Sequence, residues 1–253
     1  MLKVRVMPTL LYREPGLVKG EGFDSWRTIG TPMQSLRVYN MRRVDELVFL
    51  DIAATGERRS IDFELIDELA DECFMPFTVG GGVRTVDDVR RLLHVGADRV
   101  AVNTAAAETP DLIRDIAACF GSQCVVASID ARREDGGGHQ VYTRSGSKPT
   151  GLDTVGHARR MEELGAGEIL LTCIERDGTL SGYDIDLVRS VSKAVSIPVI
   201  ASGGAGSPAD MHAAITEGGA SAVAAAAMFH FTEQTPLEAK RHLHERGIPV
   251  RLS

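Results

Sequence analysis

The sequence predicts a (β/α)8 barrel, one domain over residues 1–253 that is built from two similar half-barrels. Short apolar runs alternate with amphipathic helical stretches, which is the pattern of βα units on a parallel sheet. The length of 253 residues is typical of such a barrel. Landmarks of the first half also recur in the second half at one fixed offset, as a duplicated half-barrel requires.

Eight strands are expected, each short and rich in apolar or β-branched residues. They span residues 4–11, 47–51, 77–79, 99–102, 124–130, 168–172, 199–202 and 222–226. The helical stretches between them include 62–73, 86–95, 111–120, 154–164, 184–193, 209–217 and 236–246. Asp62 and Asp184 precede their apolar periodicity and are expected to be N-caps.

Three landmarks recur after 122 residues. Gly81-Gly82 recurs as Gly203-Gly204, Glu46 as Glu168, and Asp62 as Asp184. Two four-strand units closing into one barrel explain this offset. An open doubly wound sheet is the structural alternative, but its halves need not match. The polar, glycine-rich segment 132–148 is the one obvious insertion, and we expect a small hairpin or a loop on the barrel rim.

Composition excludes several classes of function. The formal net charge is −7 and the basic residues are scattered, so nucleic acid is not an expected partner. The four cysteines show neither CxxC spacing nor the density of a disulfide framework, which indicates a reduced, cytoplasmic setting. The first residues lead directly into a predicted strand, so we expect no signal peptide, and no apolar run approaches the roughly 20 residues of a membrane span. We expect neither a metal ion nor a cofactor.

Two glycine turns at strand ends predict two anion sites across one barrel mouth. Glycines let backbone N–H groups approach an anion, and the following helix adds its positive end. A single glycine turn is about as often an ordinary βα connection as an anion site. Two equivalent copies across one mouth favour a ligand phosphorylated at both ends. We call the first set the first cradle and the second set the second cradle. The first cradle comprises Gly81, Gly82, Asn103 and Thr104; the second comprises Asp177, Gly178, Gly203, Gly204, Ala226 and Ala227.

Two carboxylates end strands at this mouth. Asp130 follows a fully apolar run and is the better candidate for acid–base chemistry. For Asp51, a salt-bridged or loop-capping role is at least as favoured. The counterpart of Asp130 in the other half should end strand one, where the sequence has Leu11. Acid–base cyclisation by two opposed carboxylates therefore lacks one partner.

Four charged residues begin strands and are expected at the opposite end of the barrel. They are Arg5, Glu46, Arg99 and Glu168, which we call the charged ring. From physical chemistry alone a stabilising salt-bridge ring is favoured, and a gate that closes the barrel axis is the alternative.

The motifs together resemble the HisF family, the cyclase subunit of imidazole glycerol phosphate synthase, over essentially the whole chain. They are Val79-Gly-Gly-Gly-Val-Arg, Val102-Asn-Thr-Ala-Ala, Phe120-Gly-Ser-Gln, Gly165-Ala-Gly-Glu-Ile-Leu, Arg176-Asp-Gly-Thr, Val199-Ile-Ala-Ser-Gly-Gly and Phe229-His-Phe. The resemblance implies a glutaminase partner, HisH, that releases ammonia at the barrel base. Ammonia then passes through the barrel and attacks a bisphosphorylated ribulosyl-aminoimidazole ribotide, and a cyclisation–lyase reaction follows.

The resemblance also assigns roles to individual residues. It makes the charged ring the ammonia gate, with Arg99 in place of the usual lysine, and it makes Asp98 a docking residue for the glutaminase. Asp130 matches one of two catalytic aspartates, and Lys19 lies with Arg27 in a flexible loop after strand one and is a second catalytic candidate. The other aspartate falls on Leu11, in Thr9-Leu-Leu-Tyr where the family has Cys-Leu-Asp-Val. The phosphate-site serine falls on Ala227.

Three hypotheses follow from these departures. The first is an ammonia-channelling subunit similar to the WbuZ-like proteins of surface-polysaccharide clusters, which pair with a HisH-like glutaminase and pass ammonia to a separate, ATP-dependent sugar amidotransferase. The second is the authentic cyclase, with Glu14 or Asp51 replacing the missing acid. The third is a non-catalytic scaffold that activates the glutaminase.

Overall fold

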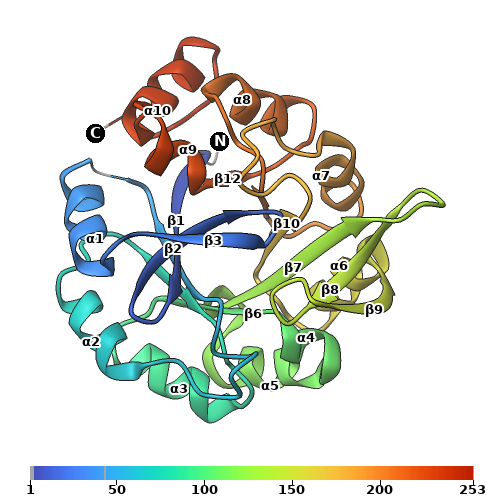
Figure 1. The fold of residues 1–253 in the computed structure, drawn as a ribbon. Helices are drawn as coiled ribbons and strands as arrows, with labels where there is room; N and C mark the ends of the chain where they lie inside the picture. Colours follow the sequence, from blue (N-terminus) through green and yellow to red (C-terminus); the bar gives the residue numbers. More distant parts are fainter. Residues whose placement is uncertain (1–2, 43, 253) are drawn as a thin grey trace.

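The computed structural model describes residues 3–42 and 44–252, and its centre is a closed barrel of eight parallel strands (Figure 1). In order around the barrel they are β1 (Arg5–Arg13), β4 (Leu47–Asp51), β5 (Phe77–Gly80), β6 (Arg99–Val102), β7 (Val125–Arg133), β10 (Glu168–Cys173), β11 (Val199–Ser202) and β12 (Ala222–Ala225). The barrel closes where Arg5 of β1 pairs with Ala222 of β12. The predicted fold class is confirmed, and the open doubly wound sheet is excluded.

Helices surround the barrel, and each long helix leads the chain back to the base for the next strand (Figure 1). They are α1 (Pro32–Met41), α2 (Phe63–Asp71), α3 (Val86–His94), α5 (Asp111–Phe120), α6 (Thr154–Glu163), α7 (Ile185–Ser192), α8 (Pro208–Thr216) and α10 (Pro236–Glu245). The predicted ranges did not include α1 or two short helices at the mouth, α4 (Thr104–Glu108) and α9 (Ala227–Phe231). A single 3-10 turn, η1 (Ser122–Cys124), precedes β7.

Helix capping repeats between the two halves, as the internal repeat predicts. Asp62 accepts hydrogen bonds from two backbone N–H groups at the start of α2, and Asp184 accepts one at the start of α7, which confirms both predicted N-caps. Thr85 and Ser207 each form a reciprocal capping box with an aspartate three residues later. These two residues are also 122 positions apart, so the duplication extends to local hydrogen bonding.

Two antiparallel hairpins extend from strand ends over the mouth. The first is β2 (Gly16–Glu21) with β3 (Asp24–Gly30), which lies across the barrel in Figure 1. The second, β8 (His139–Thr143) with β9 (Lys148–Asp153), continues the extended β7 and occupies the predicted insertion. The hairpin alternative for segment 132–148 is therefore confirmed.

The barrel interior is layered because side chains of a strand alternate between its two faces. In β1, Arg5, Met7, Thr9 and Leu11 share the inward face, while Val6, Leu10 and Tyr12 belong to the core between barrel and helices. Above the charged ring lies what we call the apolar layer. It consists of Met7, Val48, Ala101, Val126, Leu170, Ile200, Ala222 and Ala224. The polar mouth follows above it.

A buried ion pair fastens the last helix to the barrel base. Lys240 Nζ of α10 lies 3.1 Å from Asp45 Oδ1, and both side chains are almost completely buried. The second oxygen of Asp45 accepts a hydrogen bond of 3.0 Å from the backbone N–H of Val6 at the start of β1. The pair therefore connects α10, β1 and the segment before β4.

No helix in residues 3–42 and 44–252 is long and apolar enough to cross a membrane. Within the same ranges, no group of three or more His, Cys, Asp and Glu side chains is arranged to hold a metal ion.

Removing one partner of the buried pair should destabilise the fold strongly. Lys240→Ala leaves the Asp45 carboxylate buried without its cation, and we expect a loss of about 3–5 kcal/mol in the free energy of unfolding. Urea denaturation measures it. The matched control is Arg114→Ala, which breaks an exposed helix pair with Asp111 and should change stability by less than about 1 kcal/mol. Equal, small effects of both substitutions would show that the pair is not a structural clasp.

Candidate functional site at the barrel mouth

One cavity at the mouth collects most of the predicted site residues. Asp130 and all ten residues of the two cradles line it. The two hairpins also contribute lining residues that sequence reasoning missed, namely Phe23, Trp26 and Ser145. They were missed because the two-residue turn of the β2–β3 hairpin, Gly22-Phe23, is not one of the usual Asn-Gly or Asp-Gly pairs, and nothing local in the sequence places its aromatic side chains over the barrel.

The glycines of the cradles are required by backbone geometry. Gly82 and Gly203 have φ values of 67° and 82°, in the left-handed region that favours glycine. A Cβ at Gly203 would lie 2.6 Å from the carbonyl oxygen of Cys173, and one at Gly82 would lie 2.9 Å from that of Arg59. The short helices that follow, α4 and α9, have no side-chain cap on their first N–H groups. The tight turns and the uncapped N–H groups agree with the predicted anion sites.

Asp130 ends the inward face of β7 and is 9% exposed. Asn103 Nδ2 donates a hydrogen bond of 3.2 Å to its Oδ2. Burial, and then the negative charge of Asp177, raise the pKa of Asp130 to about 7. Both the protonated and the ionised form are therefore available near neutral pH, which is what a general acid–base group requires.

Asp51 lies in the same cavity but is fully engaged. Its Oδ2 lies 2.6 Å from Nη1 of Arg59, and its Oδ1 accepts hydrogen bonds from the backbone N–H groups of Ala53 and Ala54 at 3.1 and 3.0 Å. This is the salt-bridged, loop-capping arrangement. Glu14 is exposed and does not line the cavity. Neither residue is placed to replace the missing acid.

Leu11 occupies the place that mirrors Asp130. Leu11 pairs with Leu50 across β1 and β4, and Asp130 pairs with Thr172 across β7 and β10. Leu50 and Thr172 are 122 positions apart, so the pairings are equivalent in the two halves. Leu11 is inward-facing and lines the cavity. The two mirrored positions therefore differ, because β1 places the apolar side chain of Leu11 in the cavity where β7 places Asp130.

Lys19 of β2 reaches the second cradle. Its Nζ lies 2.6 Å from Asp177 Oδ2, and the residue is 1% exposed. The backbone N–H of Gly22 donates a 2.8 Å hydrogen bond to the carbonyl oxygen of Asp177. Arg27 of β3 stacks over the Phe231 ring at 4.0 Å. The segment expected as a flexible loop is thus a hairpin held over the second cradle.

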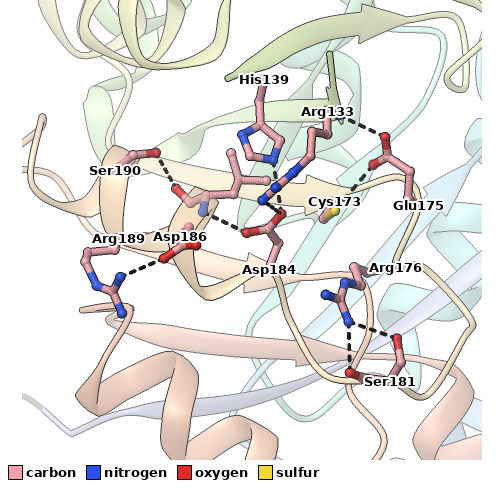
Figure 2. A network of polar contacts seen from close by, with 11 residues as sticks. Arg133, His139, Cys173, Glu175, Arg176, Ser181, Asp184, Asp186, Arg189 and Ser190 are labelled. Atoms are coloured by element: carbon pink, nitrogen blue, oxygen red, sulfur yellow. Dashed lines mark hydrogen bonds and ion pairs between the residues drawn. The ribbon is translucent and has the colours of Figure 1, made fainter. Parts of the chain in front are cut away.

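The β8–β9 hairpin is held from the opposite side by the polar network in Figure 2. His139 Nε2 and Arg133 Nη2 lie 3.0 and 3.4 Å from Asp184 Oδ2, at the N-cap of α7. The hydrogen bond from His139 holds the pKa of Asp184 well below its ordinary value. At the other end of the hairpin, the backbone N–H of Arg144 donates a 3.0 Å hydrogen bond to Thr104 Oγ1 of the first cradle.

The charged ring is closed by ion pairs at the barrel base. Arg5 bridges Glu46 and Glu168 at 2.7 and 2.9 Å. Arg99 forms an ion pair with Glu46, although its Nη1 lacks hydrogen-bond geometry there. Thr78 Oγ1 donates a 2.7 Å hydrogen bond to the buried Glu46. A stabilising ring and a closed gate share this geometry.

Exposed apolar side chains at the same end of the barrel as the ring were missed from the sequence. Met41, the last residue of α1, is 76% exposed, and Phe74, in the connection from α2 to β5, is 83% exposed. Asn40 joins these two segments, because its side chain donates to Glu72 O at 2.6 Å and accepts from the N–H of Phe74 at 3.2 Å. Asp98 lies on the same base and accepts a 2.8 Å hydrogen bond from the N–H of Phe77.

The raised pKa of Asp130 predicts a pH-dependent stability. The unfolded chain ionises this carboxyl above about pH 4 and the folded chain only near pH 7, so the folded state is penalised as pH rises between these values. Asp130→Asn should therefore gain stability over the wild type across this window, by at most about 4 kcal/mol. Urea unfolding on both sides of the window measures the gain. Asp111→Asn, at an exposed carboxylate, is the control, and parallel profiles for Asp130→Asn and wild type would contradict the shift.

Comparison with known proteins gives one consistent result. Residues 5–235 match the family model described as histidine biosynthesis protein. Two proteins from two strains of Caulobacter vibrioides, each named imidazole glycerol phosphate synthase subunit HisF, are 53% identical to this chain over 253 residues. The aligned region is all of this chain and 97% of each relative.

Proposed function

This chain belongs to the histidine biosynthesis protein family as a member of its HisF group, and from that premise we propose that it is the synthase subunit of a glutamine-dependent amidotransferase complex. The observation that carries the proposal is that two different groups of polar residues lie at the two ends of the same barrel axis. A titratable carboxyl, Asp130, lies in a cavity between two glycine cradles at one end, and a charged ring lies at the other.

The favoured activity is that of the imidazole glycerol phosphate synthase cyclase. Both relatives carry this name, so the cyclase activity of our second hypothesis gains over sugar amidation, although neither Glu14 nor Asp51 is placed to replace the missing acid. In this proposal a bisphosphorylated ribotide spans the two cradles, with its reacting centre beside Asp130. Asp130 transfers the protons of the cyclisation–lyase reaction. We expect weaker phosphate binding at the second cradle for two reasons. Ala227 offers no hydroxyl, and the positive charge of Lys19 is already paired with Asp177.

Ammonia would enter through the charged ring and cross the apolar layer. Ionised groups at the end of a barrel core need partners, because unpaired buried charge is costly. In the ring every charge has one: Arg5 joins Glu46 and Glu168, and Arg99 pairs with Glu46. If Arg5 releases either Glu46 or Glu168, it keeps an ion pair with the other glutamate. The ring could therefore open without leaving Arg5 unpaired, which supports the gate interpretation. The apolar layer above it favours neutral ammonia over the ammonium ion.

The glutaminase would dock on the barrel base. Exposed apolar surface next to polar residues is typical of protein interfaces. Met41 and Phe74 provide such a surface at the same end of the barrel as Asp98 and the charged ring. A docking site here places released ammonia at the ring rather than in solvent.

One observation favours a second candidate, ammonia delivery to a separate sugar amidotransferase. Leu11 can neither donate nor accept a proton, and no second free carboxylate lines the cavity in the described part of the chain. Neither Caulobacter relative is named for surface polysaccharides, so this candidate rests on Leu11 alone. The scaffold hypothesis has no comparable support. A cytoplasmic location remains a prediction.

Ribotide turnover with added ammonium salt tests the cyclase proposal. Because one acid–base group commonly contributes about two to four decades in rate, we expect slow turnover by the wild type and an increase of at least about 100-fold in Leu11→Asp. Leu11→Asn is the matched control, since it adds polarity without a titratable proton. Absence of turnover in both the wild type and Leu11→Asp would contradict the cyclase assignment, and glutaminase binding would then decide whether the ammonia-delivery candidate survives.

Substitution of the exposed aromatic residue at the base tests the docking surface. Phe74→Asp should weaken binding to a HisH-type glutaminase by about 30-fold, since a central aromatic contact is commonly worth about 2 kcal/mol. Calorimetric titration measures the affinity. Leu152→Asp, at an exposed apolar residue of β9 near the opposite end, is the control and should bind like the wild type. If both variants bind alike, the partner does not use this surface.

A further inference from the structure

Thr9 has a buried hydroxyl with no hydrogen-bond partner. The residue lies on the inward face of β1, between Met7 of the apolar layer and Leu11 of the mouth. It lines the mouth cavity and is 6% exposed. Its Oγ1 is completely buried and meets no donor or acceptor in the described part of the molecule.

An unpartnered buried hydroxyl is destabilising compared with a methyl group of the same shape. Valine would fill this strand position without that cost, and it is the commoner choice in a buried strand. The neighbours of Thr9 on its own strand and on β4 are apolar, since it pairs with Val48. The hydroxyl therefore contributes nothing to the fold that valine would not supply.

The place of Thr9 along the barrel axis indicates what the hydroxyl serves. It lies where the apolar layer ends and the cavity begins, so a molecule moving from base to mouth passes it before it reaches the level of Asp130. A small neutral molecule with N–H groups fits this environment.

We propose that Thr9 is a positioning residue for ammonia, a step that rests on the proposed function. Rotation about χ1 brings its buried Oγ1 toward the barrel axis, where it accepts an N–H of the incoming ammonia and leaves the nitrogen lone pair directed toward the ligand in the mouth. The interaction completes a hydroxyl that the fold leaves unsatisfied.

Steady-state kinetics with ammonium salt separate this role from a structural one. Thr9→Val should raise KM for ammonium about tenfold, the effect of one modest hydrogen bond, and leave KM for the ribotide unchanged. Thr9→Ser should restore the wild-type value. Thermal unfolding of Thr9→Val should be no lower than that of the wild type, because the variant removes an unsatisfied group. An unchanged KM for ammonium in a stable Thr9→Val protein would overturn the proposal.

A crystallographic measurement keeps the test independent of ribotide turnover. Hydroxylamine is neutral near physiological pH and shows two-atom density, so crystals of wild type and Thr9→Val are soaked in it. Density within hydrogen-bond distance of Thr9 Oγ1 in the wild type that is lost in Thr9→Val supports the role of Thr9. Failure of all variants to turn over ribotide would count against the proposed function alone. Equal density in both crystals, or none near residue 9, overturns the role of Thr9.

Discussion

Closure of eight parallel strands is the constraint on which the rest of the structure depends. Once β12 pairs with β1, every second residue of each barrel strand must point into one shared axis. The chain fills that axis with charges at the base, small and branched apolar residues in the middle, and polar residues at the mouth. A charged residue in the middle layer would have no partner within reach, whereas Arg5 at the base reaches two glutamates. The layering therefore follows from the closed geometry as well as from the proposed chemistry.

Duplication explains both what the two halves share and where they differ. The glycine turns, the N-caps and the capping boxes recur because they form the same βα connections twice. The pair Leu11 and Asp130 breaks the repeat at a position where the backbone pairing is equivalent. Asp130 is held in an electrostatic environment that keeps it titratable near neutral pH. Leu11 makes the position that mirrors Asp130 apolar, so the proposed proton transfer falls to Asp130.

Sequence periodicity predicted the eight strands to within a few residues, because buried parallel strands are short apolar runs, and the 122-residue repeat favoured the closed barrel over an open sheet. Asp62 and Asp184 were predictable as N-caps because each directly precedes a helical pattern of apolar residues. The β2–β3 hairpin was not, since its position depends on Lys19 and Arg27 meeting Asp177 and Phe231, which are more than 150 residues away in the chain. Sequence alone also left open whether Asp51 acts in catalysis. Its ion pair with Arg59 depends on a loop geometry that no pattern encodes.

The two ends of the barrel place separate demands on the chain. At the base, removing Arg5 leaves Glu168 without its ion pair, and removing Glu46 leaves Arg99 without its ion pair, so the charged ring is sensitive to the loss of either residue. At the mouth, exchange of an aspartate for Leu11 leaves no charge unpaired, because Asp130 is uncharged for part of the time and Asp177 is neutralised by Lys19. Acid–base capacity at the mouth can therefore change without loss of stability, while the base cannot change in the same way. Under the proposed function, this asymmetry would allow the acid–base chemistry at the mouth to change while the ammonia entrance at the base is kept.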